Sequence, residues 1–484
     1  MIEESVKIHN NLTVEIKLGY HARNKKKVSN FAVNTWFFVP NSLDINSYTY
    51  DKKEFYRDLK SNIRLITPVY LLKDIHSGSG CPMEKLEEAI VKMVSQPTRS
   101  RIAEFEHHIK MFQSILKSAL REESIHIIAN LSDEECRFIA QEFHVNLGHI
   151  VNKYRGLRRK LQVATINADI LNYFLFGDEF MSNIIEQHAF KVLESCENHK
   201  KPGKIQQIFT EIIQSEAEYR QVKGYLSAKK NAADSNRELV HKLTLLKKYV
   251  ENVLFVTAHK KKDGVLKQQV YYSLAAGISM VFATAIAFSF QLKYGNFTMP
   301  FFVALVVSYM LKDRIKELGR YYFAHKLGKS YFDQKTRITL NNNYIGWCKE
   351  AMDFVDEEKV PVEIRKLRNR SAILEANNRN NDEKIILYRK LIRLRRENLD
   401  RTSPYKTRGL NDIVRFNLQA FTLKMDNPQV PLYLSSKPHE VDVVQAEKIY
   451  FVNILMQFRN EDQYDYKRYR IIFNREGIKE IEYL

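Results

Sequence analysis

Residues 270–292 read VYYSLAAGISMVFATAIAFSFQL and residues 297–311 read FTMPFFVALVVSYML, with only Lys293-Tyr294-Gly295-Asn296 between them. A membrane-spanning helix needs roughly 20 mostly apolar residues, and neither stretch contains a charged side chain. The two stretches therefore predict a helical hairpin that crosses the bilayer twice, at residues 269–312. The alternative interpretation is a buried helical hairpin within a large soluble domain.

Basic side chains flank the predicted hairpin at both of its ends. They are Lys260, Lys261 and Lys262 before the first span and Lys312, Arg314 and Lys316 after the second. Because cytosolic loops carry the excess of lysine and arginine, both termini are expected in the cytosol, at the inner membrane if the protein is bacterial. The same six cations are candidates for contact with anionic lipid or another polyanion.

Small residues recur along both apolar stretches at every fourth position. They are Ala275, Ser279, Ala283 and Ala287 in the first stretch and Pro300, Ala304 and Ser308 in the second. Small side chains let helix backbones approach closely in lipid, where no hydrophobic force drives helices together. We expect these two stripes to face each other or to form a contact between two protomers. Ordinary use of small residues in membrane helices gives the same pattern.

The composition describes a large, strongly basic chain. Its 484 residues suffice for two or three domains. Lys and Arg number 76 against 57 Asp and Glu, and the resulting net charge of +19 favours contact with anionic lipid or nucleic acid. Cys81, Cys136, Cys196 and Cys348 show no C-x-x-C spacing, so they predict neither a disulfide framework nor a zinc site and suit a reducing compartment. The acidic start, with no early apolar run, predicts no cleavable secretory signal.

The predicted fold class is an α+β membrane protein with five regions. They are a β-rich N-terminal module (1–80), a cytosolic helical bundle or coiled coil (81–268), the transmembrane hairpin (269–312), a helical, basic juxtamembrane segment (313–403) and a small β-rich module (404–484). The last two regions together form a C-terminal α+β module. The sequence leaves open whether the N-terminal and C-terminal strands pair with each other.

Local patterns predict the individual strands and helices. Apolar and polar residues alternate over 12–18, and a second apolar run at 31–39 follows a basic loop, so these two are expected to pair as a hairpin. Residues 448–458 and 464–473 predict a second hairpin, with a further strand at 478–483. Between residue 83 and about residue 262, apolar residues recur at steps of three and four, which predicts long helices packed side by side.

The segment 384–396 combines basic and apolar residues. Arg389, Arg393 and Arg396 fall on one face of a helix, and leucines fall on another. The pattern predicts a basic helix that contacts anionic lipid or a polyanion. A solvated helix face packed on the C-terminal module is the alternative.

No stretch meets the geometry that a known catalytic or cofactor motif requires. Gly328-Lys329-Ser330 lacks the earlier glycine of a phosphate-binding loop, and Gly78-Ser79-Gly80 lacks the third glycine of a dinucleotide site. Glu104 and His108 offer two ligands, which do not close a metal site. The sequence therefore predicts no catalytic residue, cofactor or metal. It leaves open whether the protein is an enzyme, because catalytic groups can converge from distant segments.

These observations support three hypotheses on function. The most economical is a membrane-anchored, cytosol-facing interaction or scaffold protein, whose helical bundle and β module bind a protein partner or a second copy of the chain. The second is a membrane-tethered enzyme or effector with an active site between the cytosolic domains. The third is a membrane-tethered nucleic-acid-binding protein, which the basic composition allows.

Overall fold

The computed structural model describes residues 2–22, 26–130, 135–162, 167–198, 203–295, 298–322, 332–378, 383–437, 440–460 and 463–484. The protein is α+β with antiparallel sheets, as the sequence predicts. The chain divides into two compact units. The sandwich unit comprises Met1–Ile63, Val256–Pro404 and Gly409–Leu484, and the helical unit comprises Arg64–Phe255 and Tyr405–Arg408.

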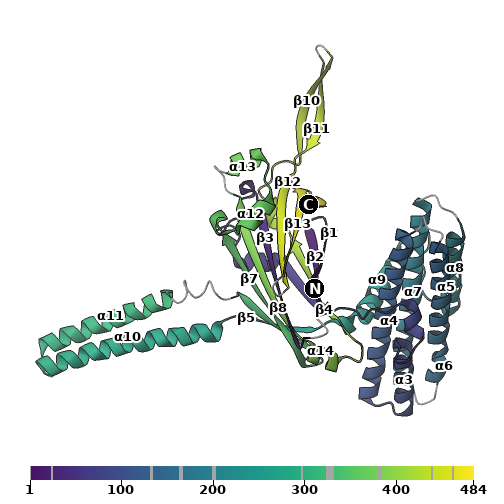
Figure 1. Ribbon diagram of the computed structural model, residues 1–484, viewed down its shortest axis with the longest axis horizontal. Helices are drawn as coiled ribbons and strands as arrows, with labels where there is room; N and C mark the ends of the chain where they lie inside the picture. Colours follow the sequence, from purple (N-terminus) through teal and green to yellow (C-terminus); the bar gives the residue numbers. More distant parts are fainter. Residues whose placement is uncertain are drawn as a thin grey trace. The chain divides into compact units, whose positions relative to one another are not determined.

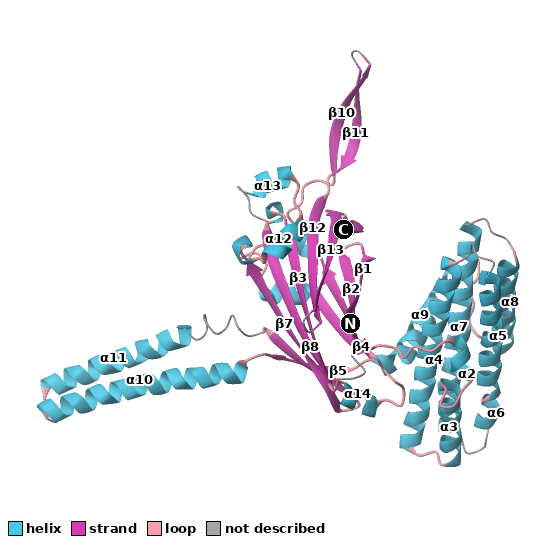
Figure 2. Ribbon diagram, in the orientation of Figure 1, coloured by secondary structure: helices cyan, strands magenta, loops and turns pink. Residues whose placement is uncertain are grey.

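Eight strands form the larger sheet of the sandwich unit (Figure 1; Figure 2). In spatial order they are β14 (Gly477–Tyr483), β13 (Gln463–Asn474), β12 (Tyr450–Asn460), β3 (Val28–Val39), β8 (Lys384–Arg395), β7 (Asn343–Val355), β6 (Gln334–Leu340) and β5 (Thr257–Lys262). The N-terminal strand β3 pairs with β12 on one side and with β8 on the other. The sequence left open whether N-terminal and C-terminal strands pair, and they do so through β3 and β12.

A second sheet packs against the larger one. Its strands, in spatial order, are β1 (Ile2–Asn10), β2 (Thr13–His21), β9 (Gly409–Asn417) and β4 (Leu59–Leu65). The ring of Phe416 on β9 lies 5.2 Å from that of Phe37 on β3, measured between centroids. The predicted hairpin of 12–18 with 31–39 is wrong, because β2 and β3 lie in different sheets. β2 and β3 both bury apolar side chains in the layer between the two sheets. A hairpin of these two strands within one sheet does not provide that burial.

The helical prediction for 313–403 is wrong at 334–340, 343–355 and 384–395, where the strands β6, β7 and β8 lie. Every second side chain of β8 is buried from Ile386 to Leu394, and the strand is paired on both edges, with β3 and with β7. The apolar residues of this segment also fit the period of a helix. Pairing with β3 on one edge and with β7 on the other makes the segment a strand. The described helices between β7 and β9 are short: η5 (Glu357–Lys359), α12 (Val362–Arg368), α13 (Ala372–Asn378) and α14 (Arg396–Thr402).

The C-terminal hairpin prediction is confirmed. Strands β12 and β13 pair with Asn460 opposite Gln463, and β14 follows as the next strand. A separate two-stranded ribbon, β10 (Gln429–Lys437) and β11 (Glu440–Glu447), precedes them (Figure 1). The remaining short elements of the sandwich unit are η1 (Asn41–Leu43), α1 (Lys52–Asp58) and α15 (Gln419–Thr422).

The helical unit consists of helices that lie side by side (Figure 1). They are α2 (Leu72–His76), α3 (Pro82–Ser95), α4 (Arg99–Ala129), α5 (Glu135–Gly156), α6 (Arg158–Leu161), α7 (Ala168–Asn198), α8 (Lys204–Lys223), α9 (Ala233–Glu251) and η2 (Asn252–Leu254). Phe105, Ile109 and Phe112, on a predicted apolar stripe, are fully buried in α4. The helices end at Leu254 and β5 follows, so the helical region does not continue to residue 268 as expected.

Helices α10 (Val265–Tyr294) and α11 (Met299–Tyr322) run alongside each other (Figure 1). In the described part of the chain, α10 alone is long and apolar enough to cross a membrane, judged by length and composition. Most of its apolar side chains are exposed, including Ile278 and Phe288. The prediction of two membrane-length helices is therefore wrong for the second, whose apolar stretch ends at Leu311.

The register of α10 against α11 shows which part of α10 lies beside the charged residues of α11. Gly319 is so close to Ala275 that a methyl group on Gly319 would lie 2.9 Å from the Ala275 Cβ, so the two positions are level. Lys312 precedes Gly319 by about 10 Å of helix, which places it beside Phe282, in the middle of the apolar stretch 270–292. A run of charged residues therefore lies alongside the first half of that stretch: Lys312, Asp313, Arg314, Lys316 and Glu317.

Candidate anion-binding face

The larger sheet carries facing basic side chains at its β5 edge. The strand register places His259 opposite Arg337, and Lys261 opposite Lys335, across β5 and β6. Directly opposed residues on antiparallel strands have Cβ atoms about 5 Å apart, and like charges at that separation are destabilising. The Lys261–Lys335 pair therefore opposes the strand pairing that brings it together.

Both rows continue across the sheet on the same side. Arg337 lies opposite Trp347 of β7, and Trp347 lies opposite Arg393 of β8. In the next row Lys335 lies opposite Lys349 of β7. We call this surface the basic face, and it comprises His259, Lys261, Lys335, Arg337, Trp347, Lys349 and Arg393.

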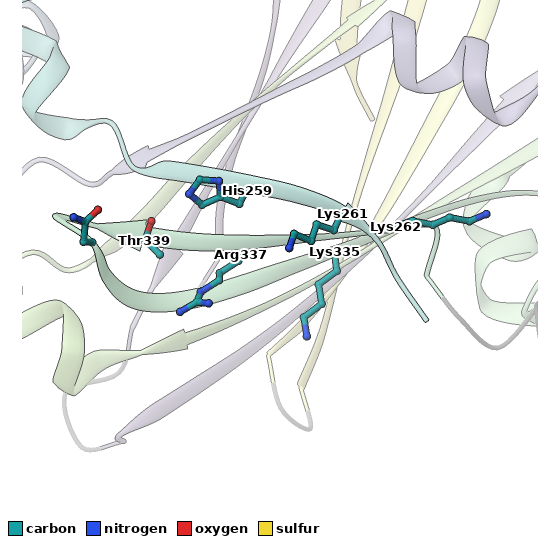
Figure 3. A pocket seen from close by; sticks show the side chains of 7 residues that line it. His259, Lys261, Lys262, Lys335, Arg337 and Thr339 are labelled. Carbon is teal, nitrogen blue, oxygen red and sulfur yellow. The ribbon is translucent and has the colours of Figure 1, made fainter. Parts of the chain in front are cut away.

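A hollow of about 570 Å³ lies on the β5–β6 part of the basic face (Figure 3). Its walls are His259, Lys261, Lys262, Lys335, Arg337, Thr339 and Asn342. Ammonium and guanidinium groups donate charge-assisted hydrogen bonds to phosphate and carboxylate oxygens. The lining therefore suits an anionic group.

Two aromatic rings are interleaved with these cations. The Trp347 ring centroid lies 5.5 Å from Lys349 Nζ and 5.9 Å from Lys335 Nζ. The Tyr344 ring centroid lies 5.0 Å from the guanidinium carbon of Arg337. Both rings are partly buried, and cations over a ring face are attracted to it. The rings thus hold flexible basic side chains close to the sheet.

Few carboxylates neutralise the basic face. Lys349 Nζ lies 2.8 Å from Asp263 Oδ2, which closes one ion pair. Within the ranges that the structure describes, no carboxylate lies within 4 Å of the charged nitrogens of Lys261, Lys335, Arg337 and Arg393.

Lys260 points to the other side of β5 and pairs with a buried carboxylate. Its Nζ lies 3.4 Å from Glu350 Oε2 and 5.5 Å from the Tyr56 ring centroid. Burial on its own raises the pKa of Glu350, but the charges of Lys390 and Lys260 lower it to about 2. The Lys260–Glu350 ion pair therefore connects β5 to the interior of the sandwich unit, and Lys260 is not part of the basic face.

The remaining predicted anion contacts do not gather on this face. Arg389 pairs with Asp353 at 2.7 Å, and Arg396, at the start of α14, pairs with Asp400 at 3.1 Å. The other three predicted cations are on α11: Lys312, Arg314 and Lys316. Of the nine predicted contacts, the structure brings Lys261, Lys262 and Arg393 to the face or its hollow.

The predicted small-residue stripes lie within the α10–α11 pair. The buried residues of these two otherwise exposed helices are Ala275, Ser279, Ala283, Ala304 and Ser308. Ala287 is half-buried and Pro300 is exposed. Five of the seven predicted packing residues are therefore enclosed where the helices meet.

The sequence analysis missed Lys335, Arg337, Trp347 and Lys349, because it assigned helix to their segment. A local signal was present at Asn341-Asn342, where both residues have positive φ angles of 48° and 65°. Asparagine tolerates this conformation, which two-residue hairpin turns require. An Asn-Asn pair between two alternating segments predicts a hairpin, and here it joins β6 to β7.

Neither a metal-binding cluster among the described residues nor a similar protein points to a function for the chain. Among the described residues, no three His, Cys, Asp or Glu side chains are grouped to hold a metal ion. The four cysteines are buried and form no disulfide bond within the described residues. No family model, curated protein or solved structure matches the chain.

Proposed function

We propose that the protein attaches to a membrane through α10 and α11 and binds anionic phosphate groups at the membrane surface through the basic face. The observation that carries this proposal is that Lys261 and Lys335 lie directly opposite each other and that neither has a carboxylate partner among the described residues. A bound anion relieves this repulsion and so stabilises the folded protein by mass action.

The exposed apolar side chains of α10 support the membrane attachment. An apolar surface of this length needs apolar surroundings. Residues 282–292 of α10 and 299–311 of α11 are apolar on both helices, over roughly 16–20 Å, which is close to one leaflet of a hydrocarbon core about 30 Å thick. A full crossing puts Lys312 and its charged neighbours at mid-depth, at roughly 2.5–3.5 kcal/mol each. We therefore propose that the tip enters one leaflet and that both termini stay on one side, the cytosolic side.

Vesicle flotation with the full-length protein tests the basic face. We expect more protein to float with vesicles that contain phosphatidylserine than with phosphatidylcholine vesicles. Added salt should reduce this excess, because it screens exposed charges. Lys335→Glu should remove most of the excess, whereas Lys230→Glu, an equal change of charge on the exposed surface of the helical unit, should leave it unchanged.

Three outcomes contradict the proposal. Equal flotation with both kinds of vesicle rules out anionic recognition, and equal effects of the two variants rule out the basic face as its site. A single-stranded oligonucleotide that binds in place of the anionic vesicles and depends on Lys335 identifies nucleic acid as the partner instead. The scaffold role stays a prediction for the helical unit.

A further inference from the structure

Three ionisable side chains meet between the two sheets of the sandwich unit. Lys390 of β8 is 1% exposed, Glu350 of β7 is 3% exposed and Asp412 of β9 is 0% exposed. Lys390 Nζ lies 3.1 Å from Glu350 Oε1 and in direct contact with Asp412 Oδ2. Glu350 is directly opposite Lys390 in the strand register, whereas Asp412 belongs to the other sheet. The lysine therefore bridges the two layers.

Hydrogen bonds hold these groups in a defined arrangement. Ser61 Oγ, on β4, donates to Asp412 Oδ1 at 2.7 Å, and Lys390 Nζ donates to Ser61 Oγ at 3.2 Å. The Tyr388 hydroxyl donates to Glu350 Oε1 at 2.5 Å. Asp412 Oδ2 accepts no hydrogen bond from the described residues and is left facing the amine.

Apolar side chains surround the cluster. A small cavity lined by Val33, Phe37, Val414, Phe416 and Lys390 has a volume of about 10 Å³, which is about the space of one water molecule. Water is therefore largely excluded. In such surroundings an ion pair is poorly compensated for its lost hydration, and a neutral group of similar size is often more stable.

We propose that Lys390 and Asp412 condense into an intramolecular amide that joins the two sheets covalently. The site contains each group that this reaction needs: an amine, a carboxyl group in contact with it, and a second carboxylate beside the amine. It also has a hydroxyl donor on the oxygen that becomes negative during the attack. The product removes two buried charges and leaves Glu350 paired with Lys260.

The steps balance without an additional reactant. A proton moves from the Lys390 ammonium to Asp412 Oδ2, and the neutral Nζ then attacks the Asp412 Cγ. The Ser61 hydroxyl stabilises the negative charge that develops on Oδ1. Glu350 accepts the second proton from Nζ and delivers it to the Oδ2 hydroxyl, the Cγ–Oδ2 bond breaks, and one water molecule leaves. Glu350 returns to its carboxylate form.

The initial proton transfer is the energetically unfavourable equilibrium of this scheme. Burial on its own lowers the pKa of Lys390, but the Asp412 and Glu350 carboxylates raise it well above its ordinary value. The charged lysine is therefore the starting state, and the neutral amine forms rarely. Because the reaction happens once per molecule and needs no turnover, a small population of the neutral amine is sufficient.

Intact-mass spectrometry of the denatured full-length protein tests the proposal. We expect a mass lower by one water molecule than the sequence requires. Trypsin cannot cleave after an acylated lysine, so digestion should yield a branched peptide in which 390–393 is joined to 409–415. A full-length mass equal to that of the sequence overturns the proposal, and so does a lost water without this branched peptide.

Variants assign the roles of the three residues. Lys390→Met and Glu350→Gln should retain the full mass of their sequences. Asp412→Asn releases ammonia instead of water, so its condensed product should have the same mass as the condensed wild-type protein. Asp353→Asn, on the same strand as Glu350 but outside the cluster, should still lose one water. Condensation that is unaffected by Glu350→Gln contradicts the proton-transfer role of Glu350, and condensation in Lys390→Met contradicts the assigned bond.

Discussion

At Lys335 of the basic face, the positive charge favours anion binding but lowers the stability of the folded sandwich unit. It lies opposite Lys261 on β5 and opposite Lys349 on β7. Lys335→Glu converts both repulsive pairs into attractive ones, so we expect the free energy of unfolding of the sandwich unit to rise by about 0.5–1 kcal/mol. Urea unfolding followed by tryptophan fluorescence measures this change, because both tryptophans, Trp36 and Trp347, belong to the sandwich unit.

The neutral variant Lys335→Gln is the control for this residue. It removes the repulsion without adding attraction, so its stability should fall between those of the wild-type protein and Lys335→Glu. A loss of stability in Lys335→Glu contradicts the proposed conflict at this edge. We expect Lys335→Glu to be more stable than the wild-type protein and to bind anionic vesicles more weakly. This combination is typical of a binding site whose residues lower the stability of the fold.

The α10–α11 pair is the element whose depth in the membrane can be measured directly. Phe288 and Ile278 are both exposed on α10, but Phe288 lies toward the apolar tip and Ile278 beside the charged part of α11. In vesicles, a membrane-impermeant maleimide should label Ile278→Cys and spare Phe288→Cys. The native cysteines are buried, so they should contribute little labelling.

Detergent solution without vesicles is the control for the labelling experiment. Protection of both positions in vesicles indicates a full crossing and contradicts insertion of the tip alone. Equal labelling of both positions in vesicles contradicts membrane attachment through α10. The two engineered cysteines therefore distinguish three arrangements of one element.

For the whole molecule, the division into two units predicts two unfolding transitions. His108, whose Nδ1 lies 2.8 Å from the Tyr405 hydroxyl, and His188 are buried in the helical unit, and burial lowers the pKa of each to about 4. Between pH 6.5 and pH 4 the unfolded chain binds protons that these folded histidines do not, so the stability of the helical unit falls as the pH falls. The pKa of Glu350, lowered to about 2, affects the sandwich unit only below about pH 4.5.

Thermal unfolding at pH 7 and pH 5 should separate these contributions. We expect circular dichroism of the helices to show a lower transition temperature at pH 5, while the tryptophan transition of the sandwich unit moves little. The double variant His108→Gln/His188→Gln should weaken the pH dependence. A single transition by both probes, or equal shifts of both, contradicts this expectation.

The spacing of apolar residues along the chain predicted the element correctly where this spacing fits only a helix or only a strand. The β12–β13 hairpin, the buried stripe of α4 and the long apolar helix α10 all follow from spacing along the chain. Residues 384–395 fit the periods of both a helix and a strand, and pairing with β3 and β7 decided between them. The basic face was accordingly predicted only in part, through Lys261, Lys262 and Arg393.

Periodicity along the chain thus specifies which segments are apolar and which residues share a face, because these are relations between near neighbours. The order of strands in a sheet depends on contacts between segments hundreds of residues apart, as β3 beside β12 shows. Lys261 and Lys335, and Lys390 and Asp412, are closer in the sequence, but each pair joins two different strands and depends on how those strands pair or pack. Tertiary structure alone decides such contacts, since burial in a shared core selects one pairing among many that local pattern permits.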